Sequence, residues 1–268
     1  MLFRHWQIGV DIQHDALRVV AVQRQRYGWQ LRGWWQAPLE AGWVIQGRVV
    51  DLNAVAGALA RLRRQWPLGY RIRVGMPVGR TVLRHVPSPA VQLREQAFHD
   101  YVGQVAARQL DIPVEKLCWD YTAQAERSGI DIVAAHHEDV TTLQRCLSLA
   151  QCRVDAITPD ALALGIFQPI VGEHQWIICR TCTHWVWSSS TGWGSLPVTD
   201  AAGCMAVCDQ LRCVPQNAWF CGQITSDDQK QINILEPWRA IQRVSPPLPD
   251  DDYRYALAVG LAMGEYPQ

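Results

Sequence analysis

Two short apolar runs joined by a few polar residues open the chain, and they constrain its fold more than any other feature. Residues 8–12 and 17–22 are almost entirely aliphatic, and the turn between them begins at Gln13. Runs of this length, joined so closely, predict two buried antiparallel strands. The turn residues Tyr27 and Gly28 precede a third such run, over 30–36. The chain is therefore expected to begin with three antiparallel strands.

Composition sets the size of the fold and raises the question of partners. A chain of 268 residues, 49% of them hydrophobic, can bury a large core as one α/β domain or as two lobes. Charge is unevenly placed: residues 1–110 hold 15 basic and 6 acidic residues, whereas residues 111–268 hold 10 and 19. A basic front half could meet an anionic membrane surface, a nucleic acid, or an acidic part of the same protein or of a partner. We favour the last of these.

The nine cysteines raise the possibility of a metal site. Only Cys179 and Cys182 have the close spacing of zinc ligands, and they lie in an apolar run that reads as a single strand over 175–187, where residues three apart face opposite sides. The cluster His136-His137-Glu138-Asp139 is better explained by a strand end before a helix. We expect buried free thiols and no metal. The sequence also shows no signal peptide and no apolar run long enough to cross a bilayer, which predicts a cytoplasmic protein.

Strands and helices alternate along the remainder of the chain, which favours an α/β fold. The first helix is expected to be capped by Asn53 and to be stopped by Pro67. The periodicity predicts helices over 53–66, 93–110, 139–152, 159–167, 201–212 and 253–263, and strands over 71–77, 82–86, 116–123, 131–136, 193–198 and 219–221. Hairpins near both ends suggest a duplicated lobe.

Six blocks in a fixed order carry a resemblance to a known family. They are Ile-Gly-Val-Asp-Ile (8–12), Val-Gly-Met-Pro-Val (74–78), Ala-Phe-His-Asp-Tyr to Trp-Asp-Tyr (97–121), Val-Ala-Ala-His (133–136), Val-Asp-Ala-Ile to Ala-Leu (154–162) and Ala-Leu-Ala-Val-Gly-Leu-Ala (256–262). In this order the blocks resemble the PilM-type pilus-assembly proteins, an actin-like family related to the cell-division protein FtsA. The resemblance spans nearly the whole chain and is strongest to the HofM-type members.

The resemblance implies an actin-like (ribonuclease H-like) α/β fold of two lobes around a cleft. Residues 1–81 would form the first lobe, 82–154 a small inserted α/β subdomain, and 155–268 a second lobe whose helical subdomain is shortened between Gly192 and Trp219. It also implies a partner, the cytoplasmic N-terminal peptide of a bitopic PilN-like protein of the inner membrane. The assembly would belong to type IV pilus, secretion or competence machinery, with a HofM-type role in using extracellular DNA as a nutrient.

In actin-like proteins the first hairpin cradles a nucleotide phosphate, and here that cradle is altered. Close approach to a phosphate needs glycine, but Gln13 and His14 stand at the turn. Asp11 could hold a hydrated magnesium ion through water, or could simply be solvated at a strand end. We place Asp11, Gln13, Arg18 and Gly222 in a vestigial nucleotide cleft.

The family's other nucleotide elements are also degraded. The second phosphate loop corresponds to residues 177–183, which contain neither a carboxylate nor a glycine, and Arg180 adds a positive charge that would oppose a metal ion. Of the adenosine-binding glycine pair only Gly222 is left. We therefore expect no catalytic residues, no ATP hydrolysis and no resident cofactor, although ATP with magnesium remains an alternative.

The sequence thus supports three readings of function. The first is a non-catalytic scaffold that holds the partner peptide between the first lobe and the inserted subdomain, with Met76, Pro77, Leu83 and Val86 forming the wall. The second is an ATPase of the same fold, and the third is direct DNA binding by the arginine-rich front half. Self-association is possible under each reading.

Overall fold

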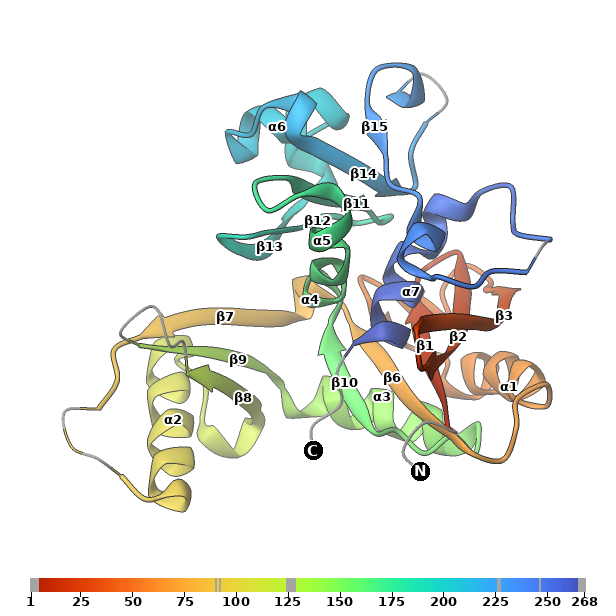
Figure 1. Ribbon diagram of the computed structural model, residues 1–268. Coiled ribbons are helices and arrows are strands. Elements are labelled where there is room, and N and C mark those ends of the chain that lie inside the picture. Colours follow the sequence, from red (N-terminus) through yellow and green to blue (C-terminus); the bar gives the residue numbers. More distant parts are fainter. Residues whose placement is uncertain are drawn as a thin grey trace.

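The computed structural model describes residues 5–89, 91, 93–123, 129–225, 228–245 and 247–264. They form two lobes, each built on a five-stranded sheet, and a small subdomain that projects from the first lobe (Figure 1). This arrangement agrees with the two-lobed α/β fold that the sequence predicts.

The first lobe is built on a mixed sheet with the strand order β10-β6-β1-β2-β3. Strands β1, β2 and β3 are consecutive and antiparallel, which confirms the three-stranded start of the chain, while β6 and β10 run parallel to β1. The bounds are β1 (Trp6–Ile12), β2 (Ala16–Gln25), β3 (Gly28–Pro38), β6 (Tyr70–Met76) and β10 (Ala156–Pro159). A two-stranded hairpin that the sequence did not predict, β4 (Val44–Ile45) and β5 (Arg48–Val49), follows β3.

Helices cover both faces of this sheet. Ile8 and Val10 pack into one core with α1 (Leu52–Arg63) and α3 (His137–Leu149), because alternate residues of a strand share a face. The last helix, α7 (Ala256–Met263), packs on the other face. It approaches so closely that a Cβ at Gly9 would lie 2.1 Å from the Ala258 carbonyl oxygen. Because Gly9 has no side chain, α7 can pack directly against β1.

The cap of α1 differs from the prediction. Asp51 is the capping residue, and its Oδ1 accepts a hydrogen bond of 2.9 Å from the Ala54 N–H. Asn53 lies one residue inside the helix. Asp and Asn side chains can both accept a hydrogen bond from the free amides of a first helical turn. The sequence therefore does not show which of Asp51 and Asn53 caps the helix.

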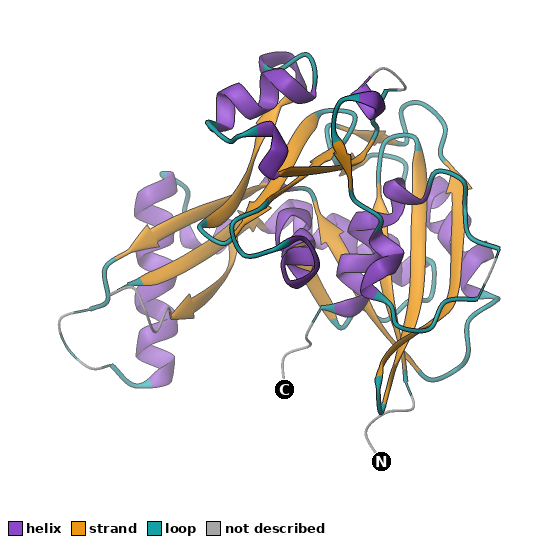
Figure 2. Cartoon of the chain, turned by 45° about the horizontal axis from the view of Figure 1, so that its top comes forward, coloured by secondary structure: helices purple, strands orange, loops and turns teal. Residues whose placement is uncertain are grey.

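The inserted subdomain is smaller than expected. Its sheet has the order β7-β9-β8, and α2 lies along one face, as Figure 2 shows. The bounds are β7 (Thr81–Val86), α2 (Glu95–Leu110), β8 (Leu117–Ala123) and β9 (Ile130–His136). The next helix, α3, instead places Leu143, Cys146 and Leu147 in the first-lobe core. The subdomain thus ends near His136, and the expected boundary at 154 places one helix too many in it.

The second lobe holds the sheet β13-β12-β11-β14-β15. Its bounds are β11 (Trp176–Arg180), β12 (His184–Ser189), β13 (Gly192–Pro197), β14 (Ala218–Gly222) and β15 (Asn233–Ile234), with helices α4 (Asp160–Leu164), α5 (Gln168–Val171) and α6 (Cys204–Leu211). The single strand expected over 175–187 is wrong, because residues 181–183 turn the chain back. The Thr181 hydroxyl closes this turn by donating to the His184 carbonyl at 2.9 Å and accepting from its N–H at 3.0 Å.

All nine cysteines are free thiols. Cys179 and Cys221 are paired in register on the parallel strands β11 and β14, and both are buried. Across the described part of the chain, no three His, Cys, Asp or Glu side chains gather as metal ligands would. No helix within that part combines the length and apolarity needed to cross a membrane.

Candidate functional site

The four residues expected in a nucleotide cleft do come together. Asp11, Gln13 and Arg18 of the first lobe and Gly222 of the second line one hollow between the lobes. We call this hollow the interlobe cleft. Arg180, Thr181, Gln223 and Arg254 line it as well.

In the turn between β1 and β2, polar groups that line the cleft bond to one another. Asp11 is 3% exposed, and its Oδ1 accepts a 2.7 Å hydrogen bond from the Gln13 side-chain amide. Burial raises the pKa of Asp11 to about 6. The Gln13 backbone N–H donates to the Ala16 carbonyl at 3.0 Å. These bonds occupy one oxygen of Asp11 and the backbone donor of Gln13.

Arg18 is also occupied. Its guanidinium is buried and donates to Asp15, with Nη2 lying 2.8 Å from Oδ2. Burial opposes the charge on Asp15, but the hydrogen bond and the positive charge of Arg18, with smaller contributions from the backbone and Arg254, together outweigh it and hold the pKa of this carboxyl below its usual value. The pair fixes the start of β2, while the buried Arg18 Nε has no hydrogen-bond partner among the described residues.

On the side of the second lobe, the backbone at Gly222 and the Arg180 side chain line the cleft. Gly222 has φ +84°, and a Cβ there would lie 2.2 Å from the Arg180 carbonyl oxygen, so this glycine is required by the packing of its own sheet. The Arg180 guanidinium carbon lies 5.2 Å from the centre of the Trp185 ring. The Thr181 hydroxyl is held within its turn.

Sequence reasoning missed a buried carboxylate beside this cleft. Asp160, at the start of α4, is 3% exposed, and its Oδ1 accepts a 2.9 Å hydrogen bond from the Val78 N–H. Burial, with the charge of Asp11 adding to it, raises the pKa of Asp160 to about 7. Val78 begins a short 3-10 helix, η1 (Val78–Arg80), which leads from the first lobe into β7. The sequence feature that could have identified Asp160 is its position directly after Pro159, at the start of a helix.

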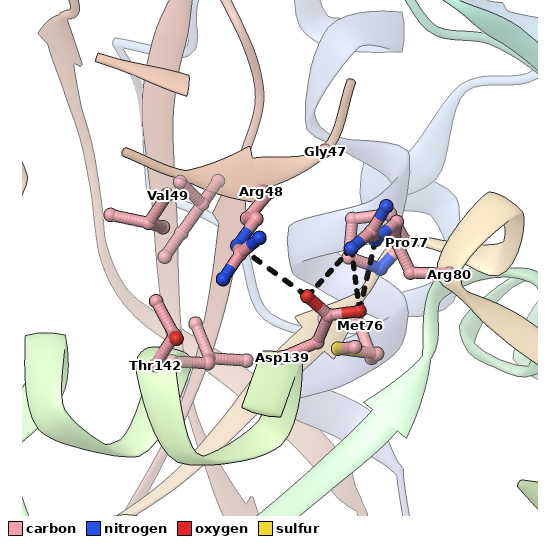
Figure 3. Close-up of a pocket in the computed structure, with 11 residues that line it drawn as sticks. Gly47, Arg48, Val49, Met76, Pro77, Arg80, Asp139 and Thr142 are labelled. Carbon is pink, nitrogen blue, oxygen red and sulfur yellow. Dashed lines mark hydrogen bonds and ion pairs between the residues drawn. The ribbon is translucent and has the colours of Figure 1, made fainter. Parts of the chain in front are cut away.

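A second hollow lies between the sheet of the first lobe, the β4–β5 hairpin and α3, beside η1, which leads into the inserted subdomain (Figure 3). We call it the junction hollow, and its enclosed part is small, about 20 Å³. The β4–β5 hairpin, the end of β6, η1 and the first turns of α3 surround it. Its lining residues are Ile12, Gly47, Arg48, Val49, Gly75, Met76, Pro77, Arg80, Asp139, Thr142 and Leu143.

Asp139 organises the charged rim of the junction hollow. Its carboxylate is 6% exposed and binds Arg80 through two bonds of 2.7 Å from Nη2 and one of 3.0 Å from Nε. Arg48 approaches the same carboxylate at 3.6 Å and also pairs with Glu138. Figure 3 shows Asp139 between the two arginines. The cluster ties η1, the β4–β5 hairpin and α3 together.

Of the four residues proposed to form a peptide wall, two line the junction hollow and two do not. Met76 and Pro77 line the junction hollow. Leu83 is half-buried on β7 and does not line it. Val86 is 2% exposed in the core of the inserted subdomain and is therefore not available to a ligand. Arg48, which does line it, is 91 positions from Asp139 along the chain, and no spacing rule joins residues so far apart.

The comparisons with known proteins identify the family. Residues 9–166 match the family model described as type IV pilus assembly protein PilM. Over 266 residues the chain is 30% identical to the DNA utilization protein HofM of Escherichia coli (strain K12), and the match covers 99% of each chain. This chain belongs to the PilM family. The resemblance seen in the sequence is thereby confirmed, including its closeness to HofM.

Solved structures confirm the actin-like fold of this PilM family member. The chain superposes on the PilM–PilN type IV pilus biogenesis complex with a TM-score of 0.73 at 15% identity, covering 96% of this chain and 97% of the other. For the cytoplasmic domain of EpsL, an inner membrane component of the type II secretion system of Vibrio cholerae, the TM-score is 0.61 at 12% identity, with 97% and 95% covered. A Bacteroides thetaiotaomicron protein with an actin-like ATPase fold gives 0.51 at 9% identity, with 87% and 92% covered.

Proposed function

We propose that this protein is a non-catalytic scaffold that binds the cytoplasmic N-terminal peptide of a bitopic PilN-like protein in the junction hollow. The observation that carries the proposal is an apolar floor beneath a charged rim, at the junction of three chain segments. The likeness to a PilM–PilN complex supports the class of partner. Through this partner the protein would lie on the cytoplasmic face of the inner membrane, and its relation to HofM supports a role in DNA utilization.

The floor of the hollow is apolar, but its enclosed space of about 20 Å³ is smaller than an aliphatic side chain, so we propose that the peptide widens it when an aliphatic anchor binds. Ile12, Val49 and Met76 pack around it, and Leu143 lies on the α3 side. Burying one Leu or Ile side chain of a peptide contributes about 1.5–3 kcal/mol. Arg48, whose side chain is 39% exposed, can add hydrogen bonds to a peptide carbonyl at the rim.

The interlobe cleft supports the non-catalytic part of the proposal. A phosphate needs free backbone donors, and a magnesium ion needs accessible carboxylates. Here the Gln13 N–H is bonded, Asp11 is covered by the Gln13 side chain, and Arg180 stands on the other wall. We propose that the actin-like fold is used as a rigid frame.

A blocked hollow tests the peptide proposal. Titration calorimetry of the full chain with the N-terminal peptide of the PilN-like partner should give saturable binding. Thr142→Trp, which places a large ring in the hollow, should weaken that binding at least about tenfold. Gln144→Trp adds the same ring to an exposed position of α3 and should bind as the parent does. Equal affinities for the two variants, with both folded, would place the peptide elsewhere.

A further inference from the structure

The end of the β2–β3 hairpin carries a second, unrelated surface. Arg24, Arg26, Tyr27 and Trp29 of the hairpin and Arg243 of a later segment border two adjoining hollows. We call these five residues the hairpin patch. It lies on β2 and β3, on the opposite side of the first lobe from the inserted subdomain (Figure 1).

The backbone beneath the hairpin patch is held in place. The Trp29 N–H donates to Gln242 Oε1 at 2.6 Å, the Leu31 N–H donates to the Arg243 carbonyl at 2.9 Å, and the Arg243 N–H donates to the Trp29 carbonyl at 3.1 Å. Gly28 has φ +120°, and a Cβ there would meet Gln242 at 2.1 Å. The patch is thus presented by an ordered turn rather than by a loose loop.

Positive charge at the hairpin patch is not neutralised locally. Arg24, Arg26 and Arg243 are exposed, and none of them pairs with a carboxylate among the residues that the structure describes. The segments that line the two hollows, 22–32, 166–170 and 238–245, contain no Asp or Glu. Although the chain is neutral as a whole, this surface attracts anions.

Apolar and aromatic groups lie among the arginines. Tyr27 is 72% exposed and Ile170 is 38% exposed, and Trp29 is half-buried beside them. The larger hollow, of about 450 Å³, is wide and open rather than a deep slot. Tyrosine and tryptophan, apolar with one polar end, favour the boundary between water and lipid.

We propose that the hairpin patch contacts an anionic lipid surface. Its guanidinium groups match phosphate and carboxylate headgroups, and its open shape fits a broad surface better than an inserted chain. Single-stranded nucleic acid is less favoured because it needs free ring faces for base stacking. Arg24 lies 4.9 Å from the centre of the Trp29 ring, which also packs on the core, and Arg26 lies 5.2 Å from the centre of the Tyr27 ring, so the exposed face of Tyr27 is the main one left for a base.

Three arginines give only modest binding. Each basic residue near an anionic surface changes a partition coefficient about fivefold, so three together change it about 100-fold. This contact is independent of the junction hollow and of any peptide bound there. It would add to the membrane affinity that a membrane-bound partner provides, but it would not replace that partner.

Vesicle co-sedimentation of the full chain tests the proposal. Wild-type protein should bind phosphatidylcholine vesicles that contain phosphatidylserine and should not bind phosphatidylcholine alone, with binding that weakens as salt rises. The triple variant Arg24→Gln, Arg26→Gln and Arg243→Gln should lose about 100-fold. The matched control Arg61→Gln, Arg64→Gln and Arg145→Gln removes the same charge from exposed positions at α1 and α3 and should bind as the parent does.

The outcomes separate lipid from other anions. Equal loss in the two triple variants, with both folded by circular dichroism, would overturn the proposal in favour of bulk charge. Binding that ignores phosphatidylserine would overturn it as well. Binding of a thymidine oligonucleotide or of polyglutamate that depends on the patch, without binding of the vesicles, would assign the surface to nucleic acid or to an acidic protein instead.

Discussion

Replacing Asp160 by asparagine should stabilise the protein at high pH. The carboxyl is buried, and its pKa rises from 3.8 to about 7 on folding. Asparagine keeps an oxygen that can accept the Val78 N–H bond of 2.9 Å, but it carries no charge. The substitution therefore removes the cost of burying a carboxylate while leaving the anchor of η1 in place.

The sign and size follow from proton linkage. Between about pH 4 and pH 7 the folded protein holds a proton on Asp160 that the unfolded chain has lost, so stability falls as pH rises through this window. Three pKa units correspond to about 4 kcal/mol above pH 7 and to roughly 1.5 kcal/mol at pH 5. Asp11, whose pKa rises to about 6, adds a slope of the same sign.

Urea denaturation followed by tryptophan fluorescence at pH 5 and pH 8 measures the effect. The gain in unfolding free energy for Asp160→Asn should be larger at pH 8 by about 2.5 kcal/mol. Asp155→Asn is the matched control, because exposed Asp155 accepts a similar bond of 2.8 Å from the Ile72 N–H without the burial. A gain for Asp160→Asn that is the same at both pH values, or a loss at pH 8, would refute the reasoning.

Three further outcomes follow from close contacts and ion pairs. Gly9→Ala should cost about 3 kcal/mol in urea denaturation, whereas Gly57→Ala, in open space on α1, should gain up to about 1 kcal/mol; a harmless Gly9→Ala would contradict the packing of α7. Arg80→Ala should cost about 3 kcal/mol because it removes the main partner of buried Asp139, and a cost near zero in the same assay would show that the cluster does not support the junction. Magnesium and ATP should produce no saturable change in tryptophan fluorescence, and a change that Asp11→Ala abolishes would revive the ATPase reading.

Local patterns in the sequence predicted the elements well where one face of a strand or helix was buried. The β1–β2 and β2–β3 hairpins followed from apolar runs bounded by turn residues, whereas the β4–β5 hairpin did not, and Met76 and Pro77 came from a strand that ends at a proline. The turn at 181–183 was missed because Thr181, Cys182 and Thr183 include neither glycine nor proline. The Thr181 hydroxyl closes the turn instead, and this hydrogen bond can be recognised only when the pairing of the two strands is known.

The charged parts of the site were beyond sequence reasoning. Asp139 meets Arg80 across 59 positions and Arg48 across 91, and only the packing of α3 into the first lobe brings them together. A helix-start aspartate is ordinarily explained by its own first turn. The same limit applies to α3 itself, since no break in composition marks its membership of the first lobe rather than of the inserted subdomain.

The packing of α7 against β1 has a consequence for synthesis on the ribosome. The helix that covers Gly9 and its neighbours is translated about 250 residues after them. Until then one face of the opening sheet is bare, and its aliphatic side chains are exposed to other nascent chains. The sheet of the first lobe is thus covered on this face only after α7 has been translated, and chaperone occupancy of the nascent protein before that point can be measured.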